Sequence, residues 1–167
     1  MSNTIKYSKL IVSLLFIFLN SARVSGQNTS HPVPDSDSLD VLKSTNEFLD
    51  AFRTLDWKRF SESFAEDATA FFPPSAKFPY RANNKKEIED IFKKVFENAR
   101  KQRSQPPYID ILPKDLKIQM IGDGAIVTFL LEDPDLLGRR TLVFKKNQGK
   151  WLIIHLHASG VITAKEN

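Results

Sequence analysis

The C-terminal part of the chain alternates between extended segments and short turn sequences, and this pattern restricts the fold most. Four segments are typical of strands, near 108–121, 125–132, 139–146 and 151–159. Three turn sequences separate them: GDG (122–124), DPDLLG (133–138) and NQG (147–149). Connections this short join neighbouring antiparallel strands. The region from Pro106 onward therefore predicts an antiparallel sheet.

Three helical patterns precede this sheet. The first, capped by Asp37 or Ser38, has a stripe at helical spacing made of Val41, Leu42, Thr45, Phe48, Leu49, Phe52 and Leu55. The second starts at Asp56 and carries Trp57, Phe60 and Phe64. After a strand at 68–72, the third starts at the cap Asn84, with the stripe Ile88, Ile91, Phe92, Val95, Phe96 and Ala99. This order predicts an α+β domain over 39–160, with three helices on one side of a curved, mostly antiparallel sheet and a tail at 161–167.

Residues 1–26 have the three parts of a secretory signal peptide. Lys6 and Lys9 precede an apolar run at 10–19 that is too short to span a bilayer as a helix, and small residues precede a cleavage site before Gln27. An uncleaved anchor is the alternative interpretation. The segment 27–38 is typical of a flexible linker, so we expect a secreted or periplasmic protein with no stable membrane association.

Most of the basic charge lies in this leader. Residues 1–26 carry three basic residues and no acidic one, so without them the net charge falls from +4 to +1. The composition therefore does not favour a nucleic acid as partner. The chain has no cysteine, which excludes disulfides. Asn28 begins a glycosylation sequon that is used only in a eukaryotic host.

The last strand contains two of the three histidines of the chain, in GKWLIIHLHASG (149–160). Strict alternation places Trp151, Ile153, His155, His157 and Ser159 on one face. The other face is apolar, with Leu152, Ile154, Leu156 and Ala158, and is expected to contact the helices. A three-residue NQG loop would place Leu142 and Phe144 on this helix-facing side. A two-residue loop would mix polar and apolar side chains on both faces, so we do not expect it.

The helix-facing side of the sheet is predicted to line a ligand pocket. Its expected lining residues are Tyr80 at the mouth, Leu130, Glu132, Arg140, Leu142, Phe144, Ile154 and Leu156. Glu132 is the candidate catalytic acid or base, because burial among leucines raises the pKa of a carboxyl. Arg140 would pair with Glu132 or hold an anionic substrate, and a purely structural ion pair is the alternative.

The histidine face is predicted to form a dimer interface. Trp151, Ile153, His155 and His157 would give a central strand an apolar outer patch, and a second copy of the chain is the simplest cover. The alternative is zinc, which a His-x-His strand can bind, but neither a cysteine nor a further histidine is at hand to complete the ligand set. We therefore predict no metal and no cofactor.

Two stretches carry a resemblance to a known superfamily. FAEDATAFFPPSAKFPYRANNKKEIEDIFKKVF (64–96) resembles the core of small SnoaL-like, or nuclear transport factor 2-like, proteins. GKWLIIHLHASG resembles the last strand of the association domain of calmodulin-dependent protein kinase II, and GDGAIVTFLLED (122–133) fits the same family's central strand. The resemblance implies a cone-shaped α+β barrel with a deep pocket, dimeric through the outer sheet face. Where that kinase domain carries pocket arginines, this sequence has Glu132, Leu142 and Ala158.

These features favour an exported domain that self-associates and binds a small, largely apolar ligand without turning it over. The alternative is a cofactor-free isomerase or cyclase that uses Glu132 as general acid or base. Fold alone does not decide between a binding protein and an enzyme. The ligand is expected to be a small molecule in either case.

The leader predicts a processed N-terminus. Signal peptidase cleavage should leave a mature chain that begins at or near Gln27. Mass analysis of the N-terminus of protein isolated from its native host measures this, and a terminus at Met1 or Ser2 would show that the leader is not removed.

Overall fold

The computed structural model describes residues 35–73, 81–133 and 136–162. The leader, Asn28, His31 and Tyr80 lie outside these residues, so the predictions that concern them stay predictions. No helix in the described ranges is long and apolar enough to cross a membrane.

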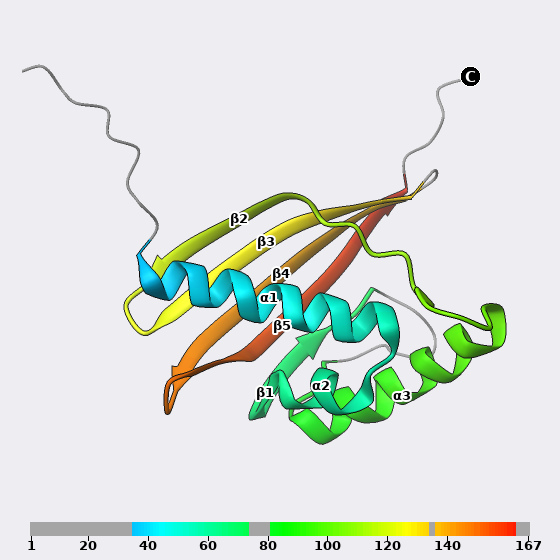
Figure 1. Ribbon diagram of the computed structural model, residues 1–167, viewed down its shortest axis with the longest axis horizontal. Helices are drawn as coiled ribbons and strands as arrows, with labels where there is room; N and C mark the ends of the chain where they lie inside the picture. Colours follow the sequence, from blue (N-terminus) through cyan, green and yellow to red (C-terminus); the bar gives the residue numbers. More distant parts are fainter. Residues whose placement is uncertain (1–34, 74–80, 134–135, 163–167) are drawn as a thin grey trace, which may run out of the picture. The chain divides into compact units, whose positions relative to one another are not determined.

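Five strands form one sheet with the order β1-β5-β4-β3-β2 (Figure 1). Their bounds are Phe64–Phe71 for β1, Lys114–Ile121 for β2, Gly124–Asp133 for β3, Leu136–Asn147 for β4 and Lys150–Ile162 for β5. β1 runs parallel to β5, whereas the other neighbours pair antiparallel. The last strand of the chain therefore lies between the first strand and the rest of the sheet.

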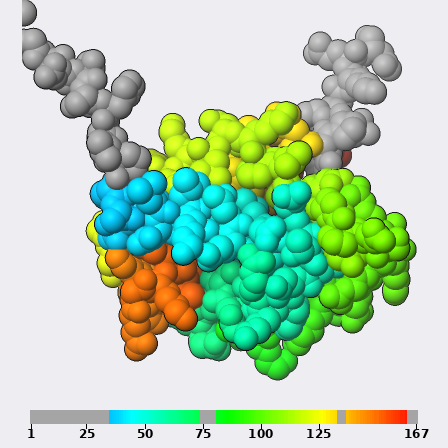
Figure 2. Space-filling model, viewed as in Figure 1, coloured from blue at the N-terminus to red at the C-terminus, as the bar shows by residue number. Residues whose placement is uncertain are grey.

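Three helices cover one face of this sheet: α1 (Ser36–Thr54), α2 (Trp57–Glu62) and α3 (Lys85–Gln102). α1 runs across the strands, and α2 and α3 contact β1 (Figure 1). The space-filling view shows α1 and α2 as one continuous surface on this side (Figure 2). The predicted α+β class, with three N-terminal helices on a curved, mostly antiparallel sheet, is confirmed.

The starts of α2 and α3 agree with the predicted caps. The Asp56 side chain accepts a hydrogen bond from the Arg59 backbone N–H at 3.1 Å. The Asn84 side chain accepts one from the Glu87 backbone N–H at 2.9 Å. Each contact satisfies a backbone donor that the first helical turn leaves without an intrahelical partner.

α1 starts earlier than predicted. Asp35 is its N-cap and accepts from the Ser38 backbone N–H, so Asp37 and Ser38 lie inside the helix. Asp37 instead forms an ion pair with Lys146 of β4. The end of the predicted linker, from Ser36 onward, is therefore helical.

Four predicted strand bounds also change. β4 begins at Leu136, within the predicted turn DPDLLG, rather than at 139. β1 begins at Phe64, which was expected on the second helix, rather than at 68. β2 begins at Lys114 and not near 108, because prolines in the preceding segment cannot donate to a strand ladder. β5 continues to Ile162, into the predicted tail.

The β4–β5 hairpin turns through two residues and not through the predicted three. Asn147 pairs with Lys150, so Gln148 and Gly149 form the turn. Their φ angles are 48° and 82°, and positive values at both central positions are typical of a tight hairpin turn. The two-residue loop was not expected, because without a bulge its register would mix polar and apolar side chains on both faces.

A β-bulge then changes which side chains of β5 face the helices. Phe144 pairs with Ile153, but the preceding residue Val143 pairs with His155, so Ile154 is an additional residue in β5. A bulge of this kind interrupts the alternation of side chains along a strand. The alternation that holds from His155 onward therefore cannot be extended back through Ile153.

The prediction that Trp151 and Ile153 share the outer face with His155 and His157 is wrong. Trp151 and Ile153 are 5% and 0% exposed and belong to the hydrophobic core. Beyond the bulge, the buried side chains are those of Leu156 and Ala158, as predicted. Leu152 and Ile154, expected on the helix-facing side, are half-buried and outside this core.

An aromatic cluster joins the helices to the sheet. Its centre is Phe60 of α2, which is fully buried. Ring centroids from all three helices and from β1 lie 4.6 to 6.1 Å from that of Phe60, namely those of Phe48, Phe52, Trp57, Phe64, Phe92 and Phe96. Contacts at these separations add to the free energy of burying the rings.

Truncating the central ring should therefore destabilise the whole domain. We expect Phe60→Ala to lower the free energy of unfolding by about 3–5 kcal/mol, as for other buried phenylalanines. Ile121→Ala, at a side chain that is 59% exposed, is the control and should change it by less than about 0.5 kcal/mol. Urea denaturation measures both, and equal effects in the two variants would contradict a core centred on Phe60.

Candidate functional site

A cavity of about 610 Å³ lies between the helices and the sheet. α1 and α3 supply Phe48, Leu49, Phe52, Phe92 and Val95. The end of β1 leads into Phe72 and Pro73, and the segment before β2 contributes Ile109, Asp110, Ile111, Leu112 and, at the start of β2, Lys114. The sheet contributes Phe129, Leu131, Glu132, Gly138, Arg140, Leu156 and Ala158.

The cavity wall is mainly apolar and rich in aromatic rings. Five phenylalanines line it: Phe48, Phe52, Phe72, Phe92 and Phe129. At the sheet, the lining residue Ala158 carries only a methyl group, so it leaves space that a larger residue would occupy. The wall therefore suits an apolar molecule.

Three of the four charged side chains of the wall, those of Asp110, Lys114 and Glu132, make ion pairs within the chain. Asp110 pairs with Arg103, and this guanidinium holds the pKa of the Asp110 carboxyl below its usual value. Lys114 of β2 pairs with Glu132 of β3. A charged ligand would have to compete with these pairs.

Glu132 lines the cavity as predicted, but not in the predicted environment. Its side chain is 49% exposed, and its carboxylate contacts the ammonium group of Lys114. The expected burial among leucines is therefore wrong. Leu130, two residues before Glu132 on β3, lies outside the cavity lining, which includes Phe129 and Leu131 instead.

Arg140 lies in the cavity wall as predicted and is half-buried. Its Nη1 donates to the backbone carbonyls of Arg139 and Ser159, both at 2.9 Å. Gly138 permits this arrangement, because a Cβ built there would lie 3.2 Å from the Arg140 Nη1. Backbone contacts therefore hold the guanidinium against β5.

Of the remaining predicted lining residues, the structure places one in the wall. Leu156 lines the cavity. Leu142 and Phe144 are 0% and 1% exposed and pack in the core outside the lining, and Ile154 is the bulge residue. The helix residues of the wall were missed as site residues, because a helical stripe does not show which of its side chains meet open space.

His155 and His157 lie outside the cavity wall. The Nδ1 of His155 is 2.7 Å from the Thr69 Oγ1 of β1. The Phe71 ring packs against both imidazoles, with centroids 5.7 and 5.9 Å away. Burial lowers the pKa of His155, and His157 and Arg81 lower it further. Within the described ranges, no group of three or more potential ligands is placed to hold a metal ion.

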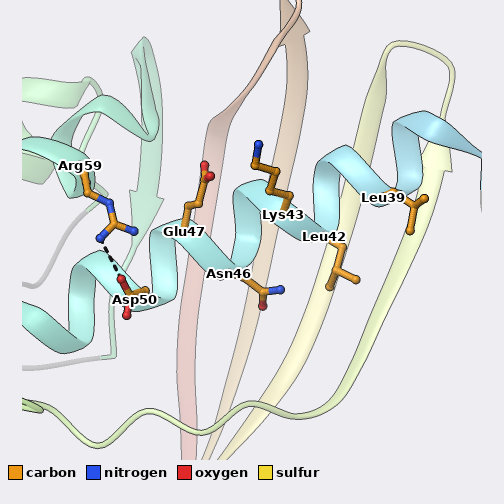
Figure 3. A pocket seen from close by; sticks show the side chains of 7 residues that line it. All are labelled: Leu39, Leu42, Lys43, Asn46, Glu47, Asp50 and Arg59. Carbon is orange, nitrogen blue, oxygen red and sulfur yellow. Dashed lines mark hydrogen bonds and ion pairs between the residues drawn. The ribbon is translucent and has the colours of Figure 1, made fainter.

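A second depression, of about 400 Å³, lies on the solvent side of α1 (Figure 3). Figure 3 shows the Arg59 guanidinium directed at Asp50, a contact of 2.8 Å. The other lining residues are Leu39, Leu42, Lys43, Asn46 and Glu47. This depression is bounded mostly by polar and charged side chains of a single helix, so we take the cavity between helices and sheet as the candidate site.

Comparison with known proteins agrees with this architecture. A family model described as the SnoaL-like domain matches residues 41–164. A proposed dehydratase of the nuclear transport factor 2-like family from Streptomyces avermitilis matches with a TM-score of 0.65 and 19% identity, over 78% of this chain and 100% of that chain. A proposed ketosteroid isomerase from Parabacteroides distasonis matches with a TM-score of 0.55 and 20% identity, over 72% of this chain and 85% of that chain.

At identities of 19% and 20%, the two solved structures show only that this chain shares their fold. The family match covers most of the chain and includes every strand of the sheet. The chain therefore belongs to the SnoaL-like domain family, as the resemblance of its sequence implied.

Proposed function

We propose that this protein is an exported SnoaL-like domain that binds a small, largely apolar ligand in the cavity between its helices and its sheet. The observation that carries the proposal is the cavity itself. Its volume of about 610 Å³ lies within the range of roughly 300–1,000 Å³ that is usual for small-molecule sites. Its wall, apolar with few polar groups, also has the usual composition of such a site.

The charges of the wall favour an uncharged ligand. Asp110 and Glu132 already pair with Arg103 and Lys114. A charged group that enters the apolar part of the cavity would lose its hydration, which is unfavourable. A neutral molecule with at most a few polar atoms near the mouth avoids this cost.

The described part of the chain supports binding of a ligand better than its catalytic conversion. An isomerase or cyclase would require an acid or base whose proton affinity is adjusted by its surroundings. Glu132, the predicted candidate, is half exposed and contacts Lys114. The two structural relatives are described as a proposed dehydratase and a proposed ketosteroid isomerase, and these descriptions apply to those proteins.

The cavity proposal predicts that a larger side chain in its wall reduces binding. Ala158→Phe should weaken binding of the uncharged fluorescent dye Nile red by about tenfold, equivalent to about 1.4 kcal/mol, because the ring occupies ligand space. Leu131→Trp is a second variant in the same wall. Dye titration measures the affinity, and circular dichroism verifies that each variant is folded.

Leu39→Trp is the matched control, since Leu39 lies in the depression on the solvent side of α1. It should bind the dye as the unmodified protein does. Unchanged dye binding in both cavity variants would contradict a binding site in the cavity. A loss of dye binding in Leu39→Trp alone would contradict it as well.

Self-association through the outer sheet face is the second part of the proposal. No helix in the described ranges covers this face. Half-buried apolar side chains lie at its centre, including Ile126 of β3, Val143 of β4 and Leu152 of β5. A second copy of the chain would remove this apolar surface from water through a two-fold contact. His155 and His157 remain on this face, whereas Trp151 and Ile153 do not.

A charge at the centre of the face should prevent this association. We expect Val143→Glu to be monomeric at micromolar concentration and the unmodified chain to be dimeric, because the carboxylate would be buried without a partner. Analytical ultracentrifugation measures the mass, with Leu39→Glu on α1 as the control. A monomeric unmodified chain would refute this part of the proposal and leave the cavity proposal intact.

A further inference from the structure

Strand β1 connects the histidines to the cavity. It is the edge strand of the sheet and pairs there with β5, and on its other side Ala70 forms an antiparallel bridge with Ala82. The strand ends at Phe71, and the next two residues, Phe72 and Pro73, line the cavity. A displacement of the end of β1 would therefore move one part of the cavity wall.

Side chains on the outer face fasten this end of β1 to β5. Thr69 and Phe71 are the partners of His155 and His157 in the parallel register. The Thr69 Oγ1 lies 2.7 Å from the His155 Nδ1, and the Phe71 ring contacts both imidazoles. The backbone register of β1 with β5 is irregular between Phe64 and Thr69, so these side-chain contacts stabilise the regular end of the pairing.

The groups that face the two histidines are mostly neutral or positive. On β4, Thr141 and Val143 lie opposite His157 and His155, and the exposed Arg139 lies one pair further along. Arg81, beyond β1, adds a positive charge that acts on His155. On β1, the exposed Asp67 precedes Thr69 by two residues and supplies negative charge.

Protonation is therefore unfavourable at this position. Burial, His157 and Arg81 lower the pKa of His155 below its ordinary value of about 6.5. Because the folded chain favours the neutral imidazole, this contribution to stability is complete at neutral pH and is lost as the pH falls below the ordinary histidine value. Acid would place a positive charge on His155, which is partly buried and beside Arg81.

We propose that His155 and His157 form a pH-sensitive fastening of β1, and that acidification loosens this strand and weakens ligand binding in the cavity. The second half of this inference rests on the proposed ligand binding. The first half concerns the strand alone and is measurable without a ligand.

Hydrogen exchange followed by mass spectrometry tests the fastening. We expect the amides of Thr69 and Phe71 to exchange faster at about pH 5 than at about pH 7.5, after correction for the intrinsic pH dependence, because protonation of His155 would place a positive charge in its contact with β1. The double variant His155→Gln/His157→Gln keeps hydrogen-bonding capacity but does not titrate, so its corrected exchange should not change. His31→Gln, at the third histidine of the chain, should behave as the unmodified protein does.

Nile red titration over the same range tests the link to the cavity. The affinity of the unmodified protein should fall by about fivefold on acidification, at the lower end of couplings between linked sites, and that of the double variant should stay constant. Measurement at two protein concentrations separates this effect from self-association, because only self-association depends on concentration.

The outcomes are distinguishable. The same pH dependence of exchange in the unmodified protein and the double variant would overturn the fastening. A pH-dependent exchange with constant dye affinity would overturn its link to the cavity. If the dye does not bind at either pH, the proposed function fails for this probe, and the exchange data still decide whether the histidines fasten β1.

Discussion

One additional residue in β5, Ile154, determines how this sheet presents its two faces. Before it, Trp151 and Ile153 point into the core. After it, Leu156 and Ala158 continue the buried face, and His155 and His157 turn outward. Without the bulge, the strict alternation of a strand would place the two buried pairs on opposite faces. The core, the cavity wall and the histidine contacts with β1 all depend on this position.

The aromatic core and the cavity are built from the same elements. Phe48, Phe52 and Phe92 contact the cluster around Phe60 with part of their surface and line the cavity with another part. The cluster fixes the helices relative to the sheet, and the small side chain of Ala158 leaves space in the cavity wall beside it. A stable core and an open cavity are therefore compatible in one small domain, because they lie side by side between the same two layers.

Much of the fold follows from the spacing of residues in the sequence. Most of the apolar stripe residues and two of the three helix caps were predicted correctly, because each depends on residues close together in the chain. Leu42, predicted in the buried stripe of the first helix, instead lines the depression on the solvent side of α1. The bulge was not predicted, because it is visible only in the pairing of β4 with β5. The two-residue turn was not predicted either, because without the bulge its register would mix polar and apolar side chains on both faces. Those two errors together moved Trp151 and Ile153 to the wrong face.

The site was predicted in part for a similar reason. Glu132, Arg140 and Leu156 were expected in the cavity wall and lie there. The partner of Glu132 was missed, because Lys114 reaches it from β2, where the register shifts near Asp115, a residue with a φ of 49°. Sequence patterns indicate which face a residue occupies, but the partner of a charge at the mouth depends on how two strands are aligned.

The central claim is that the cavity between the helices and the sheet holds a ligand. A crystal structure of the protein as isolated from its native host, combined with native mass spectrometry of the same sample, tests this directly. The account predicts electron density for one neutral, mostly apolar molecule in contact with Phe52, Phe129 and Leu156, and a matching mass difference. A bound molecule located on the solvent side of α1 instead, or a cavity that contains only ordered water, would contradict it.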